Sequence, residues 1–268
     1  MVRLLPRLMI APNGARRSKA DHPALPVTDE EIIDTARLCQ DAGADGLHLH
    51  IRDAQGRHLL DAPRYRALLD QLADQAPGMY LQVTSEAADR YNAPEQRAVI
   101  RNLRPAHVSV ALREMVQSPD DWPKARDFYH WAAESGVEIQ HILYSPDDVR
   151  AFIAGCDMGF IPDQTHLTLF VQGSYSKGSQ GSVALETYLE PFAQSDGLAF
   201  DWMACAFGAA ETDSLVRAVQ LGGKARVGFE NSLWHRDGTR AKDNADRVRA
   251  LVGALRRLQA PDQNNDIA

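Results

Sequence analysis

Eight short apolar runs recur along the chain, each separated from the next by a longer amphipathic stretch. Each run is rich in β-branched residues and has the length of a strand, because a typical helix would be longer. The runs cover residues 7–14, 45–52, 79–86, 106–112, 137–144, 165–173, 201–208 and 225–231. Eight strand–helix units at a spacing of roughly 30 residues predict a (β/α)8 barrel, the TIM barrel of the α/β class.

Signals for the start and end of helices lie between several of these runs. Thr28, with Glu31 three residues later, forms a capping box, and Gly43 ends the same stretch. Ser118 and Ser145 each stand before a proline at the start of a helical pattern. A doubly wound open sheet alternates strands and helices in the same way, so alternation alone leaves that fold open. The first run is not followed by GxGxxG, which argues against its dinucleotide-binding form.

Length and composition predict one barrel domain, residues 1–268, with a polar C-terminal tail from about residue 259. The net charge of −7 argues against nucleic acid as a partner. Three cysteines without a CxxC pair favour a reducing compartment. The sequence has neither a recognisable signal peptide nor an apolar run of 18 residues. We therefore expect a cytoplasmic protein that binds neither membranes nor nucleic acid.

Two histidines, His48 and His50, interrupt the second apolar run. Residues i and i+2 of a strand point to the same side, so we expect both imidazoles inside the barrel near its mouth. Imidazole pairs bind Zn²⁺ and other first-row metals, although two hydrogen-bonded core histidines would give the same pattern. Arg226, Gly228 and Glu230 share one face of the eighth run, which Glu230 closes. In a closed barrel Glu230 can reach the histidines and complete a His₂Glu set.

Further polar side chains lie toward the ends of other runs, where a barrel of this kind places its active site. Gln82, Thr84 and Glu86 share one face of the third run, Ser109 lies on the fourth, and Gln140 lies on the fifth. Each of them alone could be a hydrogen-bonded buried group. Their convergence on one mouth favours a site.

Two loops at the predicted mouth have the composition of anion-binding segments. The loop after the first run contains Asn13, Arg16, Arg17 and Lys19, which suits an anionic substrate or cofactor phosphates. The loop from Gly173 after the sixth run is rich in glycine and serine, so its backbone amides could hold a phosphate or a cofactor arm. A solvated surface loop is the alternative for the first of them.

Together these motifs resemble the β-keto acid cleavage enzymes, whose founding activity is 3-keto-5-aminohexanoate cleavage. The resemblance covers nearly the whole chain and is carried by APNGARRSKADHPALPVT, AGADGLHLHIRD with QGRHLLD, LQVTSE, FVQGSYS and LGGKARVGFEN. It implies a TIM barrel, usually a homotetramer, that condenses a β-keto acid with acetyl-CoA to give acetoacetate and a new acyl-CoA. It also implies a divalent metal, usually zinc, held by His48, His50 and Glu230.

The resemblance further implies roles for residues around that metal. Arg226 would hold the substrate carboxylate, Thr84 and Ser109 match hydroxyl groups of the family, and the loop from Gly173 matches the region that approaches CoA. The predicted catalytic residues are Arg226, Glu86, Thr84, Ser109 and Asn231, and the predicted substrate-binding residues are Asn13, Arg16, Gln82, Gln140 and Gly173.

Two positions depart from the family pattern. Asn231 stands where the best-known members have an aspartate assigned as the base, and a carboxamide cannot take that proton at neutral pH. Glu86 is our first candidate for the base, with the substrate carboxylate or metal-bound water as alternatives. Gln140 replaces a glutamate that binds the amino group of the aminohexanoate, so we expect a neutral or anionic β-keto acid. A metal-dependent barrel lyase or aldolase without CoA and a catalytically inactive barrel stay open as other functions.

Overall fold

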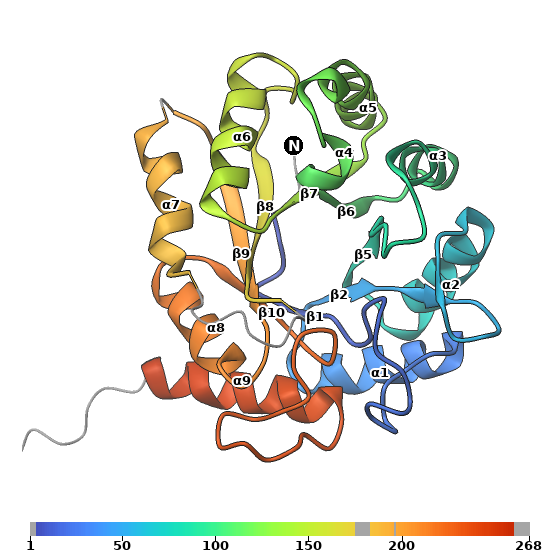
Figure 1. Cartoon of the computed structure of the whole chain (residues 1–268). Helices are drawn as coiled ribbons and strands as arrows, with labels where there is room; N and C mark the ends of the chain where they lie inside the picture. The colour runs from blue at the N-terminus through green and yellow to red at the C-terminus, as the bar shows by residue number, and fades with distance from the viewer. Residues whose placement is uncertain (1–3, 175–182, 196, 260–268) are drawn as a thin grey trace, which may run out of the picture.

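Eight parallel strands close into a barrel, and helices surround it on the outside (Figure 1). The computed structural model describes residues 4–174, 183–195 and 197–259. The order around the barrel is β1-β2-β5-β6-β7-β8-β9-β10, with β10 next to β1. The strands are β1 (Leu8–Ile10), β2 (Gly46–Leu49), β5 (Tyr80–Thr84), β6 (His107–Ala111), β7 (Glu138–Leu143), β8 (His166–Gln172), β9 (Phe200–Ala206) and β10 (Lys224–Val227). The predicted (β/α)8 barrel is confirmed.

A helical segment follows every barrel strand, as the alternation predicts. The segments are α1 (Asp29–Asp41), α2 (Ala62–Gln75), α3 (Ala93–Leu103), α4 (Leu112–Met115), η1 (Pro119–Asp121), α5 (Trp122–Glu134), α6 (Pro146–Asp157), α7 (Leu185–Gln194), α8 (Glu211–Gln220) and α9 (Asn244–Gln259). The capping box of α1 forms as predicted, because Thr28 and Glu31 each accept a hydrogen bond from the other's backbone N–H. Among the described helices, none has the length and apolarity that a membrane span requires.

Side chains of the strands alternate between the barrel interior and the surrounding helices. In β2, Leu47 and Leu49 pack into the large apolar core that the helices cover. A second apolar cluster fills the interior, from Leu5 and Tyr80 at the start of the barrel up to Ile142 and Val171 near its mouth. The interior is therefore closed at one end by apolar side chains and is polar at the other.

Two predicted strands end earlier than the sequence suggests. The run 45–52 divides into β2 and the short β3 (Ile51–Arg52), which pairs antiparallel with β4 (His58–Leu59) in a hairpin separate from the barrel. The eighth run stops being a strand at Val227, because Gly228 turns with φ +143°. The expectation that Glu230 shares a strand face with Arg226 and Gly228 is therefore wrong, since Glu230 lies in the turn.

The turn after β10 requires glycine. A Cβ at Gly228 would overlap the carbonyl oxygen of Ala11 on the neighbouring chain segment. That carbonyl instead accepts a hydrogen bond of 3.1 Å from the backbone N–H of Glu230. The close approach fixes Glu230 over the barrel mouth. The predicted tail beyond residue 259 and the glycine-rich segment 175–182 lie outside the described residues.

Candidate functional site

A cavity of about 550 Å³ opens at the carboxyl-terminal ends of the barrel strands. This is the end of a (β/α)8 barrel that carries the active site, because the loops after the strands meet there. The wall combines apolar side chains from the barrel interior with a group of charged ones: Arg16, Glu86, Arg113, Glu114, Arg226 and Glu230. A polar substrate of moderate size therefore has both charge partners and room at this end.

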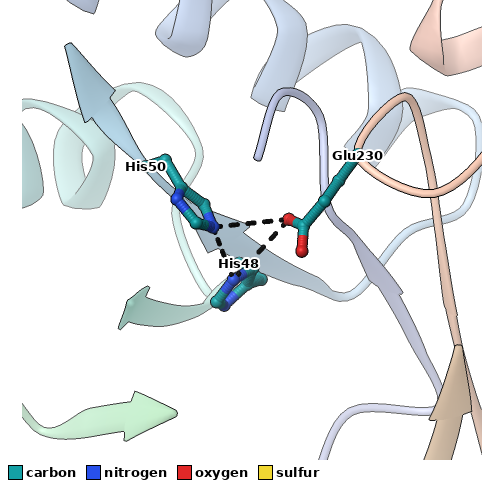
Figure 2. Close-up of side chains that lie close together, drawn as sticks. All are labelled: His48, His50 and Glu230. Atoms are coloured by element: carbon teal, nitrogen blue, oxygen red, sulfur yellow. Dashed lines mark hydrogen bonds and ion pairs between the residues drawn. The ribbon is translucent and has the colours of Figure 1, made fainter. Parts of the chain in front are cut away.

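Three potential metal ligands converge at the cavity, as predicted. Figure 2 shows the imidazoles of His48 and His50 and the carboxylate of Glu230 directed at one another. The Nε2 atoms of the two histidines lie 3.1 Å apart. Oε2 of Glu230 lies 3.7 Å from Nε2 of His48 and 3.5 Å from Nε2 of His50. Ligands bound to Zn²⁺ at about 2.0–2.1 Å in a tetrahedron are roughly 3.3 Å apart. These separations suit one divalent ion.

The protonation states of these groups also suit a metal. Burial, and then the charge of Arg226, lowers the pKa of His48 well below its ordinary value, so this imidazole is neutral. Burial alone would raise the pKa of Glu230, but the charge of Arg226 beside it opposes this, and the pKa lies well below its ordinary value. A neutral imidazole and a carboxylate are the forms that bind metals.

Arg226 lines the cavity beside Glu230. Its Nη2 donates to Oε1 of Glu230 at 3.1 Å and contacts the sulfur of Cys205 at 3.5 Å. Within the described residues its Nε and Nη1 atoms are buried without a hydrogen-bond partner. Buried donors are normally satisfied, so two open donors of one guanidinium suit a carboxylate ligand.

Side chains from three other segments hold the turn that carries Glu230. The backbone N–H of Gly228 donates to Glu211 on α8 at 3.3 Å, and that of Phe229 donates to Asn244 on α9 at 2.9 Å. Arg17 donates to the carbonyl oxygen of Phe229. Glu211 is itself paired with the buried Arg247. Arg17 therefore supports the backbone of the site, whereas the sequence suggested an anion-binding role.

Several predicted residues line the cavity, namely Arg16, Thr84, Glu86 and Gly173. The carboxylate of Glu86 lies 3.9 Å from Nε2 of His50 and 4.0 Å from Nε of Arg16, and its side chain is 23% exposed. Burial is the main cause that raises the pKa of Glu86 above its ordinary value. The hydroxyl of Thr84 accepts a hydrogen bond of 3.0 Å from the backbone N–H of Glu86 and so fixes its position.

Five other predicted residues are buried behind the cavity wall: Asn13, Gln82, Ser109, Gln140 and Asn231. Asn13 donates to the backbone carbonyl of His50 at 2.9 Å. Gln82 and Gln140 bond to each other at 3.0 Å, and Gln82 also lies against His48. The side chain of Asn231 is fully buried, and neither end of its amide has a hydrogen-bond partner among the described residues. Asn13 and Gln82 thus contact a proposed metal ligand, and Gln140 contacts Gln82.

Two residues near the site, one at the mouth of the cavity and one behind His50, were not predicted from the sequence. Arg113 lines the cavity and lies 3.4 Å above the ring of Tyr144, which also lines it. It directly follows the fourth predicted run, a position that could have identified it. His58 on β4 contacts His50, and only the hairpin brings them together. Lys19, in contrast, pairs with Glu31 and is not among the residues that line this cavity.

Two relatives match almost the full length of the chain. The 3-keto-5-aminohexanoate cleavage enzyme of Fusobacterium nucleatum is 24% identical over 264 residues, which cover 95% of this chain and 94% of the relative. The 3-oxoadipate:acetyl-CoA acetyltransferase of Cupriavidus necator is 26% identical over 258 residues, which cover 92% and 87%. The similarity to this chain therefore extends over nearly the whole length of both relatives and is not confined to a single motif.

Comparison with solved structures and with family models agrees with the barrel described above. The apo structure of ObcA superimposes with a TM-score of 0.69 at 18% identity, over 89% of this chain and 63% of ObcA, which shows a shared fold. The family model described as beta-keto acid cleavage enzyme matches residues 7–266 and so includes every side chain of the cavity. The chain belongs to the β-keto acid cleavage enzyme family.

Proposed function

We propose that this protein condenses a β-keto acid with acetyl-CoA and releases acetoacetate and a new acyl-CoA. The observation that carries the proposal is the buried His48, His50 and Glu230 cluster next to the open donors of Arg226. In the overall exchange, the bond between C2 and C3 of the keto acid breaks. The acetyl group moves from sulfur to C2, and the remaining acyl group moves to the sulfur of CoA.

His48, His50 and Glu230 would hold the divalent ion, for which we propose Zn²⁺. Two neutral imidazoles and one carboxylate form a recurrent catalytic zinc set, and the adjoining cavity leaves a position open for a substrate oxygen. When bound, the ion supplies Lewis-acid polarisation of the keto oxygen.

Arg226 is proposed to bind the carboxylate of the β-keto acid. Arg226 lines the cavity next to Glu230, and its Nε and Nη1 have no hydrogen-bond partner among the described residues. These two donors point to opposite sides of Cδ, so each can give one hydrogen bond to a substrate oxygen, and the guanidinium charge attracts the carboxylate. The same fixed positive charge would stabilise the negative charge that develops on a neighbouring carbonyl oxygen when its carbon is attacked.

Glu86 is proposed as the base, and its carboxylate would accept the proton that leaves C2 of the keto acid. It lines the cavity beside His50, and Thr84 holds its backbone. Asn231 cannot perform this step, because a carboxamide does not accept a proton at neutral pH. Ser109 is buried behind the wall, so we propose a supporting role for its hydroxyl.

A neutral or anionic β-keto acid is the proposed substrate class. Arg113 lines the cavity over the ring of Tyr144, and its charge favours a carboxylate and disfavours a cationic amino group, whereas Arg16 is paired with Asp89. CoA is proposed to enter along the loop after β8, where Gly173 and Ser174 line the cavity. From the family resemblance we also propose a cytoplasmic homotetramer.

The test is a panel of β-keto acids incubated with the Zn²⁺-loaded protein, with and without acetyl-CoA, with acyl-CoA mass as the readout. We expect a new acyl-CoA and an equal amount of acetoacetate only when acetyl-CoA is present. Turnover that is indifferent to acetyl-CoA would indicate a lyase or aldolase. No turnover of any panel member by the metal-loaded protein would indicate an inactive barrel.

A further inference from the structure

Each of the two proposed ligand histidines is backed by a chain of hydrogen bonds that ends on a backbone carbonyl oxygen. We propose that these chains hold both imidazoles as the Nδ1–H tautomer and thereby direct both Nε2 lone pairs at one point. His58, Gln82 and Gln140 are then positioning residues for the metal centre. The inference rests on the proposed metal site, but it concerns residues that are buried behind it.

The first chain runs from His50 through the β3–β4 hairpin. Nδ1 of His50 lies 3.4 Å from Nδ1 of His58, and Nε2 of His58 lies 2.9 Å from the carbonyl oxygen of Glu86. A carbonyl oxygen only accepts, so Nε2 of His58 carries the hydrogen. A neutral imidazole has one N–H and one acceptor nitrogen, so Nδ1 of His58 accepts and Nδ1 of His50 donates. Nε2 of His50 keeps its lone pair.

The second chain crosses the barrel interior. Nε2 of Gln140 donates to the carbonyl oxygen of Thr168 at 3.2 Å, which leaves Oε1 of Gln140 as the acceptor for Nε2 of Gln82 at 3.0 Å. Oε1 of Gln82 therefore faces Nδ1 of His48 at 2.9 Å and accepts its hydrogen. Gln82 is in register with His48 on the adjacent strand, which places its amide against the ring. Nε2 of His48 also keeps its lone pair.

The two chains together create a site that requires a cation. Both Nε2 atoms are acceptors at 3.1 Å from each other, and Oε2 of Glu230 is a third acceptor within 3.7 Å of both. Converging lone pairs repel one another unless a cation lies between them. Groups behind metal-bound histidines commonly fix their tautomer and orientation in this way. Gln82 and Gln140, predicted to bind substrate, are thus assigned to the metal centre.

The first experiment reads the tautomers directly, by ¹⁵N NMR of the metal-free protein labelled at histidine. With Zn²⁺ added to this sample, we expect the signals that respond to the metal, and that are lost in His48→Ala and His50→Ala, to report hydrogen on Nδ1 and the metal on Nε2. Metal on Nδ1 of either ring would overturn the proposal. The measurement needs no substrate, so it is independent of the proposed function.

The second experiment measures the Zn²⁺ affinity of the full chain by competition with a chromophoric chelator. His58→Phe removes the acceptor, and we expect Zn²⁺ binding about 10- to 100-fold weaker. His58→Gln can present both an acceptor and a donor and should stay much closer to the unmodified protein. His141→Phe is the matched control, because His141 is equally buried but packs between Tyr129 and Phe152 under the helices.

The variants separate hydrogen bonding from packing. Equal losses in His58→Phe and His58→Gln, or an equal loss in His141→Phe, would show that only packing is disturbed and would overturn the proposal. Gln82→Met should weaken Zn²⁺ binding because it breaks the chain of hydrogen bonds behind His48. Unchanged Zn²⁺ affinity in this variant would overturn the proposal for that chain. If Zn²⁺ binding follows these expectations and no β-keto acid is turned over, the proposed function fails while this inference stands.

Discussion

The two faces of the barrel strands are equally buried but differ in chemistry, and β2 shows the contrast within three residues. Leu47 and Leu49 point outward and are 0% exposed in the core beneath the helices. His48, between them, points inward to the cavity and is 1% exposed. Burial alone therefore does not distinguish a site from a core.

What marks the inward face is buried polar groups without a partner beside a cavity that a ligand can enter. The outward face buries hydrocarbon, which stabilises the barrel by about 25 cal/mol per Å². On the inward face Arg226 keeps two buried N–H donors without a partner among the described residues. An unsatisfied buried group costs about 1–3 kcal/mol, and a ligand that accepts its hydrogen bond offsets this cost. The unsatisfied donors on the inward face therefore lower the stability of the protein without ligand and favour ligand binding.

The strongest way to test this contrast is to remove a proposed metal ligand from the inward face. His48→Ala should bind less than one equivalent of Zn²⁺ by metal analysis. Loss of Lewis-acid stabilisation of several kcal/mol should lower acyl-CoA formation on the order of 10³-fold or more. Retention of a full equivalent of metal in both His48→Ala and His50→Ala would remove the ligand assignment.

A smaller loss is expected from Glu86→Gln, which keeps the shape of the side chain and removes the proposed base. General-base catalysis contributes about 10²–10⁴-fold, so kcat should fall by that range while Zn²⁺ content stays unchanged. Glu114→Gln is the control, because Glu114 also lines the cavity but its Oε2 already accepts hydrogen bonds from Ala87 and Gln96. Equal losses in the two variants would argue against Glu86 as the base.

Much of this site could be predicted because it depends on periodicity within single strands. Alternation places His48 on the inward face, and the closed order of strands places Glu230 nearby, although a turn at Gly228 and not a strand carries it. That turn depends on the close approach of Ala11, a contact between segments far apart in the sequence.

Depth within the barrel could not be predicted. Alternation gives the face of a residue, whereas its height depends on the register between strands, which the sequence does not show. Gln82 and Gln140 have the expected inward face but lie below the cavity, so they reach His48 and each other. His58 depends on a hairpin that periodicity does not reveal.

The charge at the mouth should have a modest effect on selectivity. Arg113→Leu removes one cation at the cavity entrance. We expect kcat/KM for a β-keto acid with a second carboxylate to fall roughly fivefold, which corresponds to about 1 kcal/mol. A neutral β-keto acid should be affected less. Lys124→Leu removes an exposed cation that is not among the residues of this cavity and is the control for net charge. Equal changes in kcat/KM for both substrates would show that Arg113 does not discriminate between substrates by their charge.

The smallest effect on the metal centre is expected from the outward face of β2 itself. Leu49→Ala truncates a fully buried side chain between the two histidines and should lower the free energy of unfolding by about 2–5 kcal/mol. Because Leu49 packs under the helices and shares no hydrogen bond with the ligand chains, Zn²⁺ affinity should change by about twofold at most. Denaturant unfolding and chelator competition on the same sample check both values. If the affinity instead falls as far as in His58→Phe, the two faces of β2 are not energetically separate, and metal binding depends on packing beneath the helices as much as on the polar chains inside the barrel.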